Sequence, residues 1–255
     1  RGPTDEVRHH IDRCLTCLSC MTACPSGVDY MHLVDAARAH IEENRERSFK
    51  DRTLRSVLAF VLPSPMRFRL ALKLAGLARP FIPLLERFGL KEVAAMIALA
   101  PTAGVSREGR FRGPGTAVTH GERRARVILM TGCVQPVLRP DINDATIRLL
   151  ARRGVDVIVS HGAGCCGALV HHLGKEEDAH AHARRNVDAW SKEIERSDID
   201  AIIVNASGCG TTVKDYGHML RLDPDYADRA KRVSALARDI SEFLYDYKLG
   251  APERW

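Results

Sequence analysis

Four cysteines and a proline near the amino end constrain this chain more than any other feature. The segment Cys14-Leu15-Thr16-Cys17-Leu18-Ser19-Cys20-Met21-Thr22-Ala23-Cys24-Pro25 has the spacing C-x2-C-x2-C-x3-C-P. Thiolates two residues apart on a tight loop can turn toward one centre, and the proline prevents the chain from continuing as a helix after the last of them. The spacing therefore predicts that Cys14, Cys17 and Cys20 bind one iron–sulfur cluster.

The fourth cysteine of this run has a different expected role. In two-cluster ferredoxin modules, the last cysteine of such a run binds the other cluster. Cys24 therefore points to a second run of the same kind, which these 255 residues do not contain. The segment is accordingly interpreted as half of a two-cluster module, whose first cluster needs a further ligand beyond Cys14, Cys17 and Cys20.

Zinc and disulfide bonds are the alternatives for these cysteines. Zinc sites usually combine two C-x2-C pairs, or one pair with histidines, which is a different pattern. Disulfides fit poorly because Cys14, Cys17 and Cys20 are too close in sequence for an unstrained framework, and no secretory signal precedes them. His9 and His10 are possible ligands by residue type, but a histidine on a polar helix face is usually only solvated.

The cysteine content also indicates a compartment. Eight cysteines without a signal peptide are typical of a reducing environment, where thiols bind metals or do redox work. No stretch approaches the roughly 18 uncharged apolar residues of a membrane-spanning helix. We expect a cytoplasmic chain, in contact with the inner face of the cell membrane at most peripherally. Because it starts with Arg1 and stops just after a helical stretch, it is interpreted as a fragment.

The positive charge is concentrated in one region. The net charge is +6, but residues 45–91 contain eleven Lys and Arg against three Asp and Glu, an excess of +8. No aromatic-interleaved basic groove, helix-turn-helix signature or zinc-finger spacing accompanies this charge, so nucleic acid is not the expected partner. A partner subunit or an anionic membrane surface fits it better.

The first hundred residues are predicted to be helical around the cysteine run. A helix over 4–13, capped by Thr4, leads into the cysteines, and a second helix follows Asp29. Residues 1–47 would then form a ferredoxin-like segment. Residues 48–100 contain prolines and apolar stripes, which predict short amphipathic helices. These helices either pack on the chain's own core or dock on a partner or membrane surface.

The remainder has the pattern of an α/β domain. Residues 101–124 combine glycine, proline and charge without periodicity and are predicted to be a linker. Over residues 125–255 strands alternate with helices, which implies a mainly parallel sheet with helices on its faces. The predicted strands are 127–130, 155–159 and 201–204, and the predicted helices are 141–153, 175–196, a stretch ending near 221, and 225–247. Ile142, Leu149 and Leu150 are expected to face inward. The fold class is thus α + α/β.

A second set of four cysteines follows the predicted strands. Cys133 follows the first strand, Cys165 and Cys166 the second, and Cys209 the third. Strand-to-helix loops of a parallel sheet meet along one edge, where ligands bind. We therefore expect these four thiols to hold a second cluster, cubane or less regular. Ordinary buried cysteines, or a metal-free redox pair at Cys165 and Cys166, are the alternatives. His161 and His171 lie near the same edge and are expected to have no role.

Short motifs around the cysteines resemble those of a known family. They are Arg13-Cys14-Leu15-Thr16-Cys17, Cys24-Pro25-Ser26-Gly27-Val28-Asp29-Tyr30, Gly164-Cys165-Cys166-Gly167-Ala168 and Ala206-Ser207-Gly208-Cys209-Gly210. Over nearly the whole chain they resemble the glycolate oxidase iron–sulfur subunit. That family is grouped with the cysteine-rich domain of heterodisulfide reductase, anaerobic glycerol-3-phosphate dehydrogenase and lactate-utilisation proteins.

The resemblance implies a chain with two ferredoxin-type runs and two cysteine-rich domains, of which the second run and the first domain are present. It implies 4Fe-4S clusters that relay electrons from FAD-containing subunits, which oxidise glycolate to glyoxylate, toward a membrane quinone pool. The sequence agrees, because no G-x-G-x-x-G follows the first strand and no P-loop occurs, so the flavin belongs to a partner. This chain alone is not expected to oxidise glycolate, and no residue is assigned as catalytic.

Other functions remain open. A catalytic subunit of the heterodisulfide-reductase type would reduce a substrate at the second cysteine set, although Thr212 stands where that pattern has its final cysteine. The iron–sulfur subunit of a glycerol-3-phosphate or lactate dehydrogenase would be the same relay for another substrate. A zinc module would only hold an assembly together.

Overall fold

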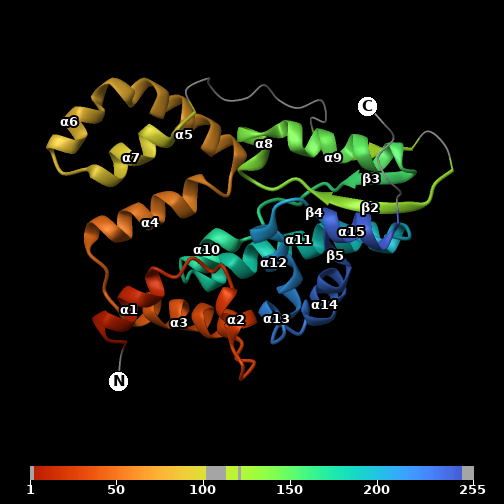
Figure 1. The fold of residues 1–255 in the computed structure, drawn as a ribbon, viewed down its shortest axis with the longest axis horizontal. Helices are drawn as coiled ribbons and strands as arrows, with labels where there is room; N and C mark the ends of the chain where they lie inside the picture. The colour runs from red at the N-terminus through yellow and green to blue at the C-terminus, as the bar shows by residue number, and fades with distance from the viewer. Residues whose placement is uncertain (1–2, 102–112, 120–121, 249–255) are drawn as a thin grey trace.

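The computed structural model describes residues 3–101, 113–119 and 122–248, so residues 102–112 and 120–121 of the predicted linker lie outside the described residues. Figure 1 shows an amino-terminal half made of helices beside a carboxyl-terminal α/β half. The elements of the first half are α1 (Asp5–Asp12), α2 (Ser19–Ala23), α3 (Tyr30–Asn44), α4 (Phe49–Val61), α5 (Pro65–Ala78), the 3-10 helix η1 (Arg79–Phe81), α6 (Ile82–Arg87) and α7 (Lys91–Leu99). No described helix is long and apolar enough to cross a membrane.

The helices begin where the sequence supplies caps. The Thr4 hydroxyl accepts a hydrogen bond from the Val7 amide at 3.3 Å, which confirms Thr4 as the cap of α1. Asp29 and Ser48 cap α3 and α4 in the same way. Helix α5 begins with Pro65, whose missing N–H is not needed in a first turn. Both helices predicted around the cysteine run are therefore present.

The second half contains a five-stranded sheet in the order β1-β3-β2-β4-β5. The strands are β1 (Gly115–Ala117), β2 (Ala125–Met130), β3 (Val155–Val159), β4 (Ala201–Val204) and β5 (Ala237–Asp239). Strand β1 is antiparallel to β3, and all other neighbours are parallel, with Val127 opposite both Val157 and Ala201. The three predicted strands are confirmed, within a mainly parallel sheet.

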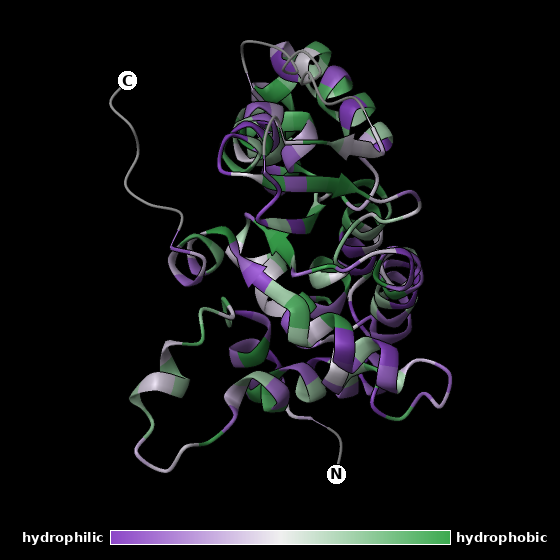
Figure 2. Ribbon diagram, turned by 90° about the vertical axis from the view of Figure 1, so that its right-hand side faces the viewer, coloured by the Kyte–Doolittle hydropathy of each residue, from purple (hydrophilic) through white to green (hydrophobic). Residues whose placement is uncertain are grey.

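Helices cover both faces of this sheet. They are α8 (Gln135–Leu138), α9 (Pro140–Arg152), α10 (Ala168–His172), α11 (Glu176–Arg196), α12 (Ser207–Lys214), α13 (Tyr216–Met219), α14 (Ala227–Leu236) and α15 (Ile240–Asp246). Helices α9 and α15 pack on one face, where Leu150 and Phe243 are buried, and α10 to α14 pack on the other, around Trp190 and Tyr216. Figure 2 shows the hydrophobic strands between these helices.

Three details of the prediction are wrong. Residues 115–117 form strand β1 within the range predicted as a linker, and strand β5 interrupts the helix predicted over 225–247. Both strands have only three residues, too few for a visible alternation of polar and apolar side chains. On α9, Ile142 and Leu149 are 37% and 40% exposed, because the buried stripe consists of Asn143, Thr146, Ile147 and Leu150, at helical spacing.

Helices α4 to α7 and η1, residues 49–99, form an arm at the upper left of Figure 1. Much of its apolar surface is uncovered within the described chain. Its exposed apolar side chains are Phe49, Val57, Phe60, Met66, Leu70, Leu74, Leu77, Phe81, Leu84, Phe88, Leu90, Met96 and Leu99. The described residues therefore do not meet the expectation that these stripes pack on the chain's own core.

Candidate iron–sulfur sites

The first cysteine set lies on the loop between α1 and α3, which contains the short helix α2. Thr16 and Leu18 within this loop have φ angles of 53° and 58°, in the left-handed region that residues with a Cβ rarely adopt. Side chains from α3 must therefore hold the loop, since such strain persists only where the surroundings impose it. Cys17 and Cys20 are exposed, whereas Cys14 is partly buried.

Backbone amides favour ionised thiols in this segment. The amide of Ser19, helped by its hydroxyl, lowers the pKa of Cys17. The amides that follow Cys24, first that of Val28, lower the pKa of Cys24. The thiolate is the form that binds metal. The Cys24 thiol contacts the Tyr30 hydroxyl at 3.9 Å, and among the hydrogen bonds of the described residues none joins the four thiols of this run to one another.

The second set is brought together at one edge of the sheet. Cys133 follows β2, Cys165 and Cys166 follow β3, and Cys209 lies in the first turn of α12 after β4. Because β2 lies between β3 and β4, the three loops meet at the carboxyl ends of adjacent parallel strands. The crossovers change direction at β2, which is where open α/β sheets bind ligands.

Contacts between thiols run through this second set. Hydrogen bonding to Cys165 raises the pKa of Cys133, and hydrogen bonds from Cys133 and Cys166 lower the pKa of Cys165. Contact with Cys165 and Cys209 raises the pKa of Cys166, and the hydrogen bond from Cys166 lowers the pKa of Cys209. These shifts indicate that each thiol of the set lies close enough to another to affect its ionisation.

Two backbone amides donate to the buried thiols. The Gly167 amide lies 3.5 Å from Cys165 Sγ, and the Ala168 amide lies 3.5 Å from Cys166 Sγ. Gly167 has a φ of 88°, and a Cβ there would lie only 3.2 Å from the Ala179 carbonyl oxygen, so the turn requires glycine. Amide-to-sulfur hydrogen bonds stabilise thiolates and adjust the potential of a bound cluster.

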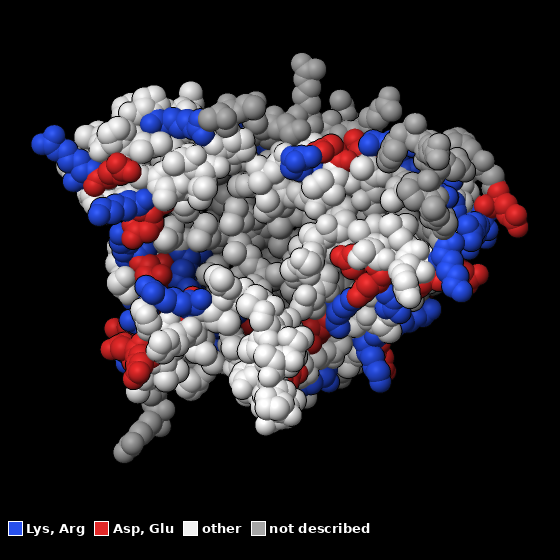
Figure 3. Space-filling model, viewed as in Figure 1, with Lys and Arg blue, Asp and Glu red and all other residues white. Residues whose placement is uncertain are grey.

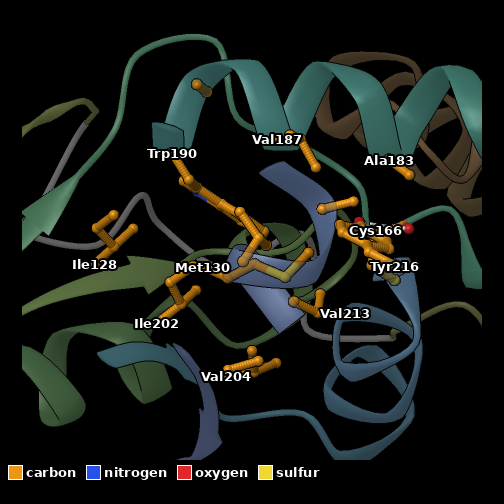
Figure 4. Close-up of a cluster of buried hydrophobic side chains, with 14 of the residues drawn as sticks. Ile128, Met130, Cys166, Ala183, Val187, Trp190, Ile202, Val204, Val213 and Tyr216 are labelled. Carbon is orange, nitrogen blue, oxygen red and sulfur yellow. Dashed lines mark hydrogen bonds between the residues drawn. The ribbon is translucent and has the colours of Figure 1, made fainter. Parts of the chain in front are cut away.

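Asn186 and Tyr216 hold the backbone of the loop at residues 164–166 through hydrogen bonds, and both side chains are fully buried. The Asn186 amide donates to the Cys165 carbonyl and to the Tyr216 hydroxyl, each at 2.9 Å, and accepts from the Gly164 amide at 2.8 Å. The Tyr216 hydroxyl donates to the Cys166 carbonyl at 2.8 Å. Figure 4 shows Tyr216 next to Cys166 within the apolar cluster. Sequence reasoning missed both residues, because neither lies near a cysteine in sequence.

The donor set fits an iron–sulfur cluster better than a single metal ion. In the described part of the chain, no three Cys, His, Asp or Glu side chains are arranged to hold one ion. Thiolates that bind a cluster ligate different iron atoms, so they need not converge on a single point. Positions Gly132 and Gly208, next to Cys133 and Cys209, have open space where a side chain would lie, which leaves room for a bulky inorganic group.

Of the four histidines considered in the sequence analysis, three are exposed and one contacts a carboxylate. His9, His10 and His161 are exposed. His171, expected to have no role, instead lies 3.1 Å from the Asp35 carboxylate, between the two halves of the chain.

Two cavities border the cysteine sets. One, of about 350 Å³, opens at the carboxyl ends of β2 and β3 and is lined by Cys165, Gly132 and Arg69 among others. The other, of about 50 Å³, is lined by Thr16 from the first cysteine loop and by Gly208, the neighbour of Cys209. The smaller cavity is therefore lined by one residue next to a cysteine of each set, Thr16 beside Cys17 and Gly208 beside Cys209.

Comparison with known proteins agrees with this arrangement. The family described as "Cysteine-rich domain" matches residues 127–214, which include all four cysteines of the second set. The "Glycolate oxidase iron-sulfur subunit" of Escherichia coli is 41% identical over 246 residues, which are 96% of this chain and 56% of that protein. The chain is a relative of the glycolate oxidase iron–sulfur subunits. A probable member from Bacillus subtilis is 31% identical over 252 residues, with the same coverage of both chains.

More distant relatives share a shorter region. "Lactate utilization protein A" of Geobacillus thermodenitrificans is 26% identical over 119 residues, 47% of each chain. No solved structure matches the chain. The chain spans little more than half the length of the glycolate oxidase iron–sulfur subunits that it matches.

Proposed function

We propose that this chain is an electron-relay subunit with two iron–sulfur centres, in a flavin-dependent complex that oxidises glycolate or a similar 2-hydroxy acid. The single observation that carries the proposal is the shared cavity, because Thr16, the neighbour of Cys17, and Gly208, the neighbour of Cys209, line the same small space. Iron–sulfur clusters bound there would supply one-electron transfer. The names of the relatives support the assignment to a glycolate-oxidising complex.

The proposed ligands divide into two groups. Cys14, Cys17 and Cys20 would hold a 4Fe-4S cluster, with Cys24 directed to another. The second centre would be held by Cys133, Cys165, Cys166 and Cys209. In this proposal the protein's part is to hold thiolates, donate amide hydrogen bonds and bury the second set. FAD would belong to partner subunits and quinone would be the acceptor, consistent with the absence of a dinucleotide-binding motif from this sequence.

The arm is the proposed docking surface of this subunit. It combines exposed leucines and phenylalanines with most of the +8 charge excess of residues 45–91. Figure 3 shows Lys and Arg side chains, with some acidic ones among them, at the left where the arm lies. A peripheral contact with an anionic membrane at the cytoplasmic face suits this combination. Binding to anionic vesicles should then fall as salt increases, and salt-independent binding would contradict the proposal.

The test is the content of iron and acid-labile sulfide after anaerobic reconstitution, with EPR spectra before and after dithionite. Two reducible centres are expected. Cys17→Ser should remove the first EPR signal and Cys209→Ser the second, each leaving the other in place. Thr22→Ser, an exposed substitution within the same run, is the matched control. Zinc without sulfide, or loss of both signals in either variant, would contradict two separate centres.

A second candidate function rests on the larger cavity. A space of about 350 Å³ bordering Cys165 is large enough for a small organic molecule. It favours reduction of a disulfide or similar substrate at the second cysteine set. Turnover of such a substrate by the reconstituted chain with an artificial electron donor would support this function over a pure relay.

A further inference from the structure

The short helix α10 spans the distance between the two cysteine sets. At its amino end, the Gly167 and Ala168 amides donate to Cys165 and Cys166 of the second set. At its carboxyl end, His171 and His172 contact side chains of α3. Any movement of α10 along its axis therefore affects hydrogen bonds to the second set.

Arg38 of α3 contacts both the first cysteine loop and the end of α10. It is only 4% exposed. Its guanidinium donates to the Cys14 carbonyl at 2.7 Å and to the Thr16 hydroxyl at 2.8 Å, and lies 3.2 Å from His172 Nδ1. Bonds from one planar cation to three groups fix their relative positions, since all its donors lie in one plane.

Packing around Arg38 leaves α10 little freedom. Asp35 lies 3.4 Å from the Arg38 guanidinium and 3.1 Å from His171, which closes the network. At Gly174, just after α10, a Cβ would lie 2.4 Å from the Arg38 carbonyl oxygen, so the two backbones touch. Thr16 and Leu18 have the strained left-handed backbone that needs such external support.

We propose that Arg38 is a positioning residue that couples the two cysteine sites through helix α10. In this role it holds the Cys14–Cys17 loop against α10 and so sets the distance between the sites. Its buried positive charge also favours the addition of an electron at the first site, because nearby positive charge stabilises the reduced form. The electron-transfer part of this inference rests on the proposed relay function, whereas the mechanical coupling does not.

The mechanical coupling is tested by amide hydrogen exchange on the full chain without clusters. Arg38→Gln should speed exchange at Gly167 and Ala168, which Arg38 does not touch, by roughly tenfold, the equivalent of one lost charged hydrogen bond. Gly174→Ala should do the same although Arg38 is retained. Arg45→Gln, at the end of α3, is the matched control and should leave both amides unchanged. Faster exchange confined to the Cys14–Cys17 loop would overturn the coupling, whether or not the chain is a relay.

The charge effect is tested by EPR-monitored redox titration of the reconstituted chain. Arg38→Gln should shift the midpoint potential of the first centre to more negative values and weaken the magnetic interaction between centres. Arg38→Lys should restore the potential but not the exchange protection, since a lysine keeps the charge and loses the planar geometry. Unchanged potentials in Arg38→Gln would overturn this part. A wild-type chain without reducible centres would instead reject the relay proposal and leave the exchange result standing.

Discussion

At the scale of single residues, the second cysteine set depends on groups that carry no redox chemistry. Asn186 has no exposed surface and connects Gly164, Cys165 and Tyr216 through hydrogen bonds that no other described residue replaces. A buried polar group that loses its partner costs the full free energy of its desolvation. The geometry of Cys165 and Cys166 is therefore determined largely by an amide one helix away.

We expect Asn186→Ala to lower the free energy of unfolding by about 2–3 kcal/mol, because several buried groups lose partners at once. The same variant should lose the EPR signal of the second centre and keep that of the first. Urea unfolding and EPR of the reconstituted chain measure the two effects. Asn44→Ala, at an exposed position of α3, is the control. Equal stability of the two variants would show that the Asn186 network does not support the loop.

At the scale of elements, one arginine joins three helices of the amino-terminal half. Arg47, 5% exposed, contacts Asp12 of α1 at 2.9 Å, Glu42 of α3 at 2.6 Å and Asp51 of α4 at 3.1 Å. Burial opposes its charge, but the hydrogen bonds that Arg47 donates to Asp12 and Glu42 outweigh burial and raise the pKa of Arg47. The connection between the cysteine loop and the arm is thus largely electrostatic.

Arg47→Met should reduce the free energy of unfolding by about 1–3 kcal/mol, less than for a fully buried pair because the three carboxylates are partly exposed. The loss arises because three acidic groups then face one another with less positive charge between them, although Arg55 remains nearby. Thermal or urea unfolding measures it, with the exposed Arg52→Met as control. High salt should reduce the difference in unfolding free energy between the two variants, because salt screens the charges. If the difference in unfolding free energy does not change with salt, the effect of Arg47→Met comes from lost packing and not from lost charge.

Prediction from sequence was successful where a recognisable pattern, such as cysteines at the ends of strands, marks the residues. Cysteine spacing and strand ends placed the thiols of Cys133, Cys165, Cys166 and Cys209 at one sheet edge, where the structure brings them together. The groups that hold this edge, such as Asn186 and Arg38, were not predictable, because their partners lie 21 and 24 residues away and depend on tertiary packing. The strands β1 and β5 were also not predicted, because three residues are too few to show a periodic pattern of polar and apolar side chains.

At the scale of the whole molecule, the two halves are joined by a partly buried group of acids and histidines. Asp35 of α3 contacts His171 and His172 of α10, and His32 of α3 contacts Asp215 at 2.8 Å. Burial opposes ionisation of Asp35, but hydrogen bonds from His171 and His172 outweigh it and hold its pKa well below the usual range. The joint between the halves therefore requires an ionised carboxylate.

This arrangement predicts an acid-sensitive joint. A carboxylate whose pKa is lowered by folding contributes stability above its unfolded pKa of about 3.9, and that stability is lost as the pH falls toward the folded pKa. Unfolding free energy of the native sequence should therefore fall more steeply below about pH 5 than that of Asp35→Asn. Urea titrations between neutral and acid pH measure this, with the exposed Asp246→Asn as control. Parallel curves for Asp35→Asn and the native sequence would contradict the assignment.

The edges of the sheet have a consequence for how the chain behaves at high concentration. Unpaired strands offer free amides and carbonyls to strands of other molecules, and long flat edges lead to aggregation. Here the outer strands β1 and β5 have three residues each, and β1 runs against its neighbour. An approaching strand would find few groups to pair with. We therefore expect self-association of this chain to proceed through the apolar arm rather than through the sheet, so that detergents, which cover apolar side chains, should reverse it.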